Sequence, residues 1–150
     1  LDLVPLASDT PTVEDLRMVL AAYRIRGMLG FRSRRAEVAR IRREVTGAVH
    51  AVQPRTVVMV FEGADGASRR RVDRIARHVT RDISVAATNA VGSDTTVIGL
   101  VVMTGQERDL AATCVRHVAV EPPERGDGLV FHAADLRRAN IYELIEEAVV

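Results

Sequence analysis

The first half of the chain shows two helical patterns of apolar residues, followed by a strand-like one. After an irregular leader, Thr12 is a good N-cap residue for a helix that the pattern extends to about Leu29. A second helix follows from Ser33, with apolar residues at helical spacing until Pro54 ends it. The apolar, β-branched run 56–61 then predicts a strand that is buried on both faces.

The second half continues with shorter elements separated by turns. In order, we expect a helix after the turn at 63–66, strands over 83–87 and 96–103, a helix after Thr104, a strand over 129–132 and a last helix over 135–149. Thr104 and Glu107 have the spacing of a capping box, which marks the start of the helix between the last two strands.

The order of these elements predicts the fold class. Its core is β-α-β-β-α-β, with two helices in front and one behind. This is the order of the ferredoxin-like arrangement, so we expect an α+β domain in which an antiparallel four-stranded sheet carries helices on one face. We divide the chain into an N-terminal leader with a connector helix (1–30) and the domain itself (31–150).

Composition narrows the classes of function. The 150 residues include 21 basic and 20 acidic ones, so the net charge is +1, and we expect no nucleic-acid partner. Every basic residue is arginine, which removes lysine chemistry. Cys114 is the only cysteine and fits a reducing cytoplasm, and no run of about eighteen apolar residues predicts a membrane span. Because the chain begins at Leu1, we expect a fragment of a cytoplasmic protein, tethered or controlled by an upstream membrane or sensor segment.

Charge is unevenly distributed along the chain. Nine arginines and one acidic residue lie between Arg17 and Arg43, whereas seven acidic residues and three arginines lie in 121–150. The basic segment fits either an anionic phospholipid surface or two amphipathic helices with solvated arginine faces. Three consecutive arginines, 69–71, lie at the expected start of a helix, where the helix dipole disfavours positive charge. These arginines fit either a bound anion or a solvated helix face. Of the four histidines, His132 alone is expected near the edge of a cleft.

Four segments carry a family resemblance. They are LGFRSRR at 29–35, VVMVFEGAD at 57–65, GSDTT at 92–96 and LRRAN at 136–140. In order and spacing they resemble the entry signature, first strand, central hairpin loop and closing helix of diguanylate cyclase (GGDEF-type) domains. The resemblance implies the ferredoxin-like fold. In active members, carboxylates at the first strand and in the hairpin bind two divalent cations that polarise the triphosphate of GTP.

The resemblance places a reduced version of that site in this chain. Glu62 stands at the first metal position and Asp94 at the second, with Gly92 and Ser93 beside it in the nucleotide-binding loop. Thr95 replaces the acidic residue that follows in the family. No cofactor is expected apart from Mg²⁺, should a guanine nucleotide bind.

The resulting hypothesis is a catalytically inactive GGDEF-like regulatory domain that forms a homodimer and relays a signal from an upstream segment. The dimer would form through an apolar stripe on the connector helix, made of Leu16, Leu20, Tyr23 and Gly27. Two alternatives stay open. One is an active metal-dependent nucleotidyl cyclase, and the other is a ferredoxin-like regulatory domain that senses a small molecule.

Overall fold

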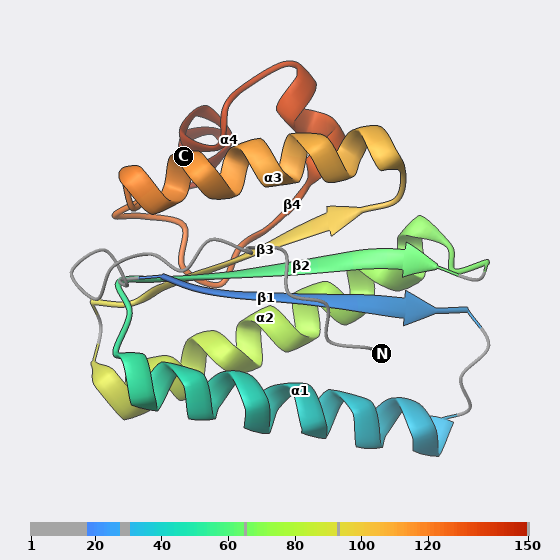
Figure 1. Cartoon of the computed structure of the whole chain (residues 1–150), viewed down its shortest axis with the longest axis horizontal. Helices are drawn as coiled ribbons and strands as arrows, with labels where there is room; N and C mark the ends of the chain where they lie inside the picture. Colours follow the sequence, from blue (N-terminus) through green and yellow to red (C-terminus); the bar gives the residue numbers. More distant parts are fainter. Residues whose placement is uncertain (1–17, 28–30, 65, 93, 150) are drawn as a thin grey trace.

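The computed structural model describes residues 18–27, 31–64, 66–92 and 94–149. In these ranges the chain forms one four-stranded sheet with helices on both faces (Figure 1). The elements are β1 Met18–Arg26, α1 Phe31–Val52, β2 Thr56–Ala64, α2 Arg69–Val91, β3 Thr96–Val102, α3 Gly105–Val120, β4 Val130–His132, the 3-10 helix η1 Ala133–Arg137 and α4 Ile141–Val149.

The four strands are all parallel and lie in the order β1-β2-β3-β4. Thr56 of β2 pairs with Met18 of β1 on one side and with Thr96 of β3 on the other. The expected antiparallel, ferredoxin-like sheet is therefore wrong, and the fold is α/β. The physical reason is that a helix separates each strand from the next, and a helical crossover returns the chain to the same end of the sheet.

The expected connector helix is also wrong over its described part, because residues 18–26 form β1. Tyr23 and Ile25 are each 1% exposed, whereas Arg24 and Arg26 between and after them are exposed, which is the period of a strand. Tyr23 is therefore a core residue, and Leu20 packs against the core of the other face of the sheet. Leu16 lies outside the described residues.

The expected strand over 83–87 is wrong as well, because α2 continues to Val91. The inner face of this helix keeps helical spacing through that segment, with Val79, Ile83 and Ala87 all buried. The other expectations for the described ranges are confirmed: a helix ending before Pro54, strands near 56–61, 96–103 and 129–132, and a last helix, which begins later than expected, at Ile141.

Two apolar cores hold the helices to the sheet. Below the sheet in Figure 1, α1 and α2 pack on one face, where Tyr23 and Phe61 lie with ring centroids 6.4 Å apart. Above it, α3, η1 and α4 pack on the other face, around Leu100 and Ile141. None of the helices in the described ranges combines the length and the apolar character that a membrane span requires.

The change of face between α2 and α3 defines a special position in the sheet. Each strand lies on the same side of the strand before it. Helices α1 and α2 lie on one face of the sheet and α3 lies on the other, so the β3–α3–β4 crossover has the opposite handedness to the β1–α1–β2 and β2–α2–β3 crossovers. About 98% of such crossovers share one hand, so this connection is unusual. As a consequence, the chain leaves β2 towards one face and β3 towards the other. In open α/β sheets, ligands bind where neighbouring connections diverge in this way.

Cys114 offers a direct test of how α3 packs on the sheet. Its side chain is 4% exposed, and burial raises the pKa of the thiol to about 12. Since the thiolate is the reactive form, we expect Cys114 to react with Ellman's reagent at pH 8 at least about a hundredfold more slowly in the folded protein than in urea. Fast labelling without denaturant would contradict the packing of α3 against β2 and β3.

Candidate functional site

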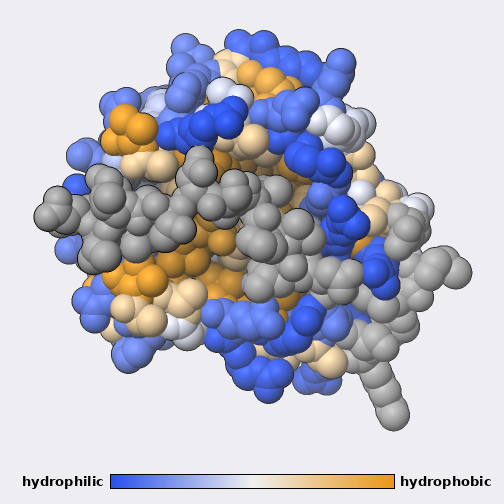
Figure 2. Space-filling view, in the orientation of Figure 1, coloured by the Kyte–Doolittle hydropathy of each residue, from blue (hydrophilic) through white to orange (hydrophobic). Residues whose placement is uncertain are grey.

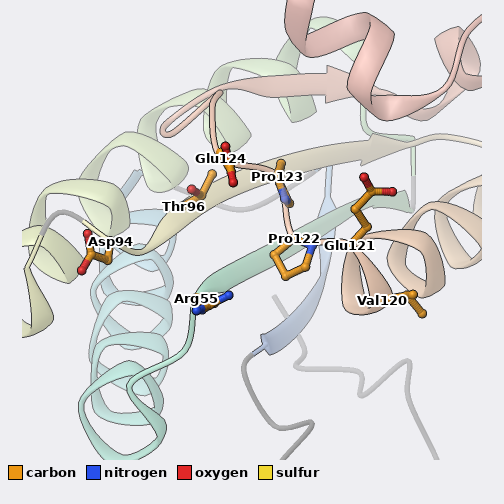
Figure 3. A pocket seen from close by; sticks show the side chains of 8 residues that line it. All are labelled: Arg55, Asp94, Thr96, Val120, Glu121, Pro122, Pro123 and Glu124. Atoms are coloured by element: carbon orange, nitrogen blue, oxygen red, sulfur yellow. The ribbon is translucent and has the colours of Figure 1, made fainter.

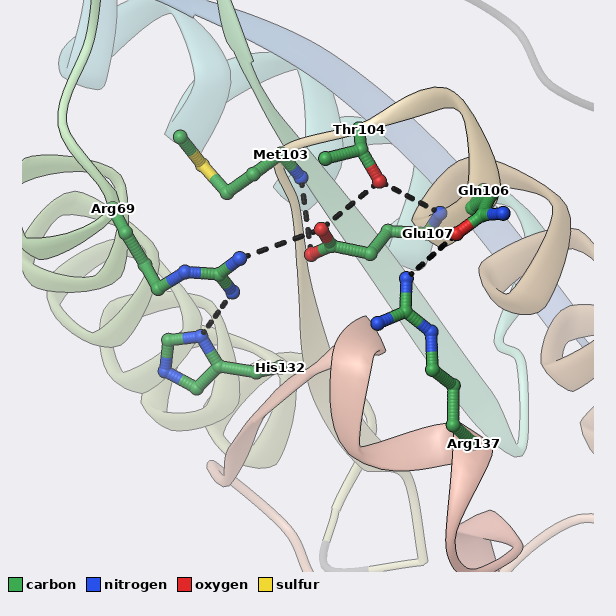
Figure 4. A network of polar contacts seen from close by, with 7 residues as sticks. All are labelled: Arg69, Met103, Thr104, Gln106, Glu107, His132 and Arg137. Atoms are coloured by element: carbon green, nitrogen blue, oxygen red, sulfur yellow. Dashed lines mark hydrogen bonds and ion pairs between the residues drawn. The ribbon is translucent and has the colours of Figure 1, made fainter.

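A network of polar side chains lies at the carboxyl edge of the sheet, where β2, β3 and β4 end (Figure 4). Arg69 comes from the first turn of α2, Glu107 from the first turn of α3, and His132 from the end of β4. The network therefore joins the β2–α2 connection, which leads to one face of the sheet, to the β3–α3 connection, which leads to the other. We call the place between these two connections the divergence.

Glu107 is the fixed centre of this network. The N-cap half of the predicted capping box is confirmed, because the amide of Glu107 donates to Thr104 Oγ1 at 3.2 Å. The Glu107 side chain reaches back to the hydroxyl of Thr104, which donates to Oε2 at 3.0 Å. The amide of Met103 donates to the other carboxylate oxygen at 3.3 Å. Glu107 is 2% exposed, so the cap of α3 also holds a buried negative charge.

Arg69 supplies the positive partner from the opposite side of the divergence. Its Nη2 lies 3.3 Å from Glu107 Oε2, and its side chain remains 45% exposed. Burial raises the pKa of Glu107, but the hydrogen bonds from Thr104 and Arg69, with the charge of Arg69, outweigh it and lower the pKa below its usual value. The carboxylate thus stays ionised at neutral pH and holds one side of the guanidinium.

His132 contacts two residues of α2 through its ring nitrogens. Nδ1 lies 3.4 Å from Nη1 of Arg69, and Nε2 lies 2.9 Å from Oδ1 of Asp73. Because arginine only donates, Nδ1 accepts in this contact, so the neutral ring carries its proton on Nε2. The contact of Nε2 with Asp73 is close but lacks hydrogen-bond geometry, and Asp73 Oδ1 has no hydrogen-bond partner among the described residues. The ring therefore links α2 to the end of β4 in one tautomer.

A second ion pair crosses the same divergence. Arg108 on α3 pairs with Glu62 at the end of β2, and the hydrogen bond and charge of Glu62 raise the pKa of Arg108. Nearby, Arg137 of η1 donates to Gln106 on α3 at 3.1 Å. Three guanidinium groups thus gather around the first turn of α3, each anchored by an acceptor of this chain.

The arrangement favours an anionic ligand. The first turns of α2 and α3 both lie at this edge, and the amide groups that begin a helix attract negative charge. A guanidinium has five N–H donors, and neither Arg69 nor Arg108 uses all of them on its carboxylate partner. Such groups bind phosphate oxygens in a planar, two-pronged geometry.

The structure does not bring Glu62 and Asp94 together. Glu62 ends β2 at the carboxyl edge, whereas Asp94 precedes the first residue of β3 at the amino edge. Thr56 pairs with Thr96, so about eight residues of strand, or roughly 26 Å, separate the two positions. Gly92, with φ +93°, ends α2 next to Asp94, and Ser93 lies outside the described residues. The expected metal and nucleotide residues therefore do not form one site.

Asp94 instead lines a surface pocket of about 610 Å³ at the amino edge (Figure 3). Arg55 and Thr96 line it from the starts of β2 and β3, and 120–124 lines it from the end of α3 and the following loop. Across the described ranges, no three or more His, Cys, Asp or Glu side chains are arranged to hold a metal ion. The carboxyl edge, with its helix starts and arginines, is the stronger candidate site.

Sequence reasoning found part of the carboxyl-edge network. It singled out Glu62, the cluster 69–71 and His132, but it missed Arg108 and gave Glu107 only a capping role. The usable signal was the position of polar residues directly after strands. It points to one site only once the strands are known to be parallel.

The chain was compared with known proteins, and no family model, curated protein or solved structure matches it. Nothing in this result identifies a GGDEF-type domain, and the antiparallel sheet that the resemblance implies is not the sheet observed. The site has to be interpreted from its own chemistry.

Proposed function

We propose that this chain is a regulatory binding domain for a small phosphorylated molecule, with nucleotides among the candidates, which docks at the carboxyl edge between the β2–α2 and β3–α3 connections. One observation carries the proposal. Arg69 and Arg108 stand on opposite sides of the divergence, and their side chains are 45% and 49% exposed. An anion between them would contact both guanidinium groups and the starts of α2 and α3.

The partners of the network favour binding over turnover. Nδ1 of His132 accepts from Arg69, and the carboxylate of Glu107 accepts hydrogen bonds from three groups. The side chains that resemble general bases therefore serve to position Arg69. This supports a role in which the ligand is held and not transformed.

The same contacts support regulation. The Arg69–Glu107 and Arg108–Glu62 pairs link the connections after β2 and β3. A phosphate that draws either guanidinium away from its carboxylate loosens that link, so binding changes how α2 and α3 are held at this edge. Such a change is the kind of local event that a partner or a further domain reads out.

The test is isothermal titration of the protein with inorganic phosphate, pyrophosphate, ATP and GTP, each with and without Mg²⁺. A hydrogen bond to a charged group contributes about 1.5–3 kcal/mol, so we expect Arg69→Gln and Arg108→Gln each to weaken binding at least about tenfold. Arg116→Gln is the matched control, because it removes the same charge from an exposed position two turns further along α3 than Arg108.

A variant with the opposite sign sharpens the test. Glu62 competes with the ligand for Arg108, so Glu62→Gln should tighten binding about two- to fivefold. Glu44→Gln, at an exposed position on α1, makes the same charge change away from the site and should leave affinity unchanged. If none of the four anions binds, or if Arg69→Gln and Arg108→Gln bind as tightly as Arg116→Gln, the proposal is wrong.

A further inference from the structure

The helices on the two faces of the sheet differ strongly in charge, although the net charge of the whole chain is only +1. Helices α1 and α2 together contain twelve arginines and four acidic residues. On the opposite face, α3 contains two of each kind, and α4 has three acidic residues and no arginine. Figure 1 shows α1 and α2 as one outer layer, and Figure 2 shows hydrophilic side chains over the α1 side of the molecule. One outer layer is therefore strongly cationic.

The exposed face of α2 carries a straight row of arginines. Arg70, Arg74, Arg77 and Arg81 follow each other at intervals of four, three and four residues, and all four are exposed. This spacing keeps them on one side of the helix over about 16 Å. Arg77 pairs with Asp73, whereas Arg70, Arg74 and Arg81 make no ion pair with any described residue.

A second row lies beside the first on α1. Arg35, Arg42 and Arg43 are exposed there, and Arg42 pairs with Asp82 of α2, which holds the two helices side by side. Packed helices lie about 8–10 Å apart, so the two rows form a cationic grid of roughly 16 by 10 Å. We call this surface the arginine face, made of Arg35, Arg42, Arg43, Arg70, Arg74, Arg77 and Arg81.

We infer that the arginine face docks on the phosphate backbone of double-stranded nucleic acid. A duplex presents one negative charge per about 1.7 Å of its axis, which matches a surface that offers charge in rows. The expectation of no nucleic-acid partner relied on a net charge of +1, and that sum averages a cationic layer with an acidic one.

The packing of the two helices favours a duplex over an anionic membrane or a single strand. The apolar faces of α1 and α2 are already buried in the core, as Val45 and Val79 illustrate, so they have no apolar face left to insert into a bilayer. Single-strand binding uses stacked aromatic side chains, but α2 has no Phe, Tyr or Trp and α1 has only Phe31, at its first position. Phosphate contacts need neither feature.

The test is fluorescence anisotropy of the chain with a labelled 20-base-pair DNA duplex across a salt titration. Each phosphate contact contributes about −0.9 to the slope of log K against log salt concentration. The triple variant Arg70→Gln/Arg74→Gln/Arg81→Gln should therefore flatten the slope by about 2.7 and weaken binding at least tenfold at 50 mM salt, equally for unrelated sequences.

The matched control removes three arginines from the opposite layer, in Arg116→Gln/Arg125→Gln/Arg138→Gln, and should keep the slope of the wild type. Equal losses in both triple variants would overturn the inference, because net charge and not the arginine face would then explain binding. Stronger retention on vesicles with anionic lipid than on the duplex, or no duplex binding at 50 mM salt, would also overturn it. Phosphate titration of the first triple variant separates this surface from the carboxyl-edge site, which it leaves intact.

Discussion

A single methyl group added at Gly99 should destabilise the protein by about 3 kcal/mol, at the upper end for overpacking in a core. Gly99 lies in the middle of β3, where α2 crosses the sheet. A Cβ atom there would lie 2.5 Å from Thr80 Oγ1 and 3.0 Å from Val130 Cγ2. All three residues are buried, so the backbone of α2 or β4 has to shift. Urea unfolding of Gly99→Ala, followed by circular dichroism, measures the loss.

A double-mutant cycle with Thr80→Ala shows whether α2 is responsible. Thr80 Oγ1 is buried without a hydrogen-bond partner in the described structure, so Thr80→Ala alone should cost little. In the double variant it removes the closest clash, and we expect a coupling energy of at least about 1 kcal/mol. Additive effects would mean that α2 does not pack on β3 at this point, and the observed layering would be wrong.

Two local errors in the sequence-based prediction account for the wrong topology. In 18–27, the helical series Leu20, Tyr23 and Gly27 coexists with the strand alternation of Tyr23 to Arg26, and the sequence does not decide between them. In 83–87, an alternating pattern is too short to outweigh the helical spacing that precedes it. With a strand at 18–26 and a helix through 83–87, the order becomes β-α-β-α-β-α-β in place of β-α-β-β-α-β. A helix then separates every pair of consecutive strands, so the sheet is parallel and not antiparallel.

Elements with several independent signals were predicted correctly. The run 56–61 is apolar, β-branched and preceded by Pro54, and the capping box at Thr104 and Glu107 is a local interaction that needs no tertiary information. The site depends on topology and was only partly predictable. Glu62 was assigned a metal partner at the far edge of the sheet, because the position of Asp94 followed from a hairpin that does not exist.

The buried carboxylate of Glu107 should be the most sensitive position in the carboxyl-edge network. Glu107→Ala removes half of the capping box and leaves the amide of Met103 and the hydroxyl of Thr104 without their acceptor. The amide of residue 107 still donates to Thr104 Oγ1 in this variant, so the N-cap itself is kept. A buried unpaired donor costs about 1–3 kcal/mol, so we expect a loss of about 2 kcal/mol in urea unfolding at pH 7. Glu143→Ala, which removes an exposed glutamate beside the start of α4, is the control for a lost helix-start contact outside the core.

Glu107→Gln separates the charge from the shape of the side chain. The pKa of Glu107 is lowered in the folded protein, so the unfolded chain takes up a proton at a higher pH than the folded one. The stability from ionised Glu107 is therefore complete above the unfolded value of about 4.3 and is lost as pH falls through the lower folded value. The stability difference between wild type and Glu107→Gln should stay constant from pH 8 to about 6 and shrink below about pH 4. A difference that grows on acidification would contradict the assignment of Arg69 and Thr104 as partners of an ionised carboxylate.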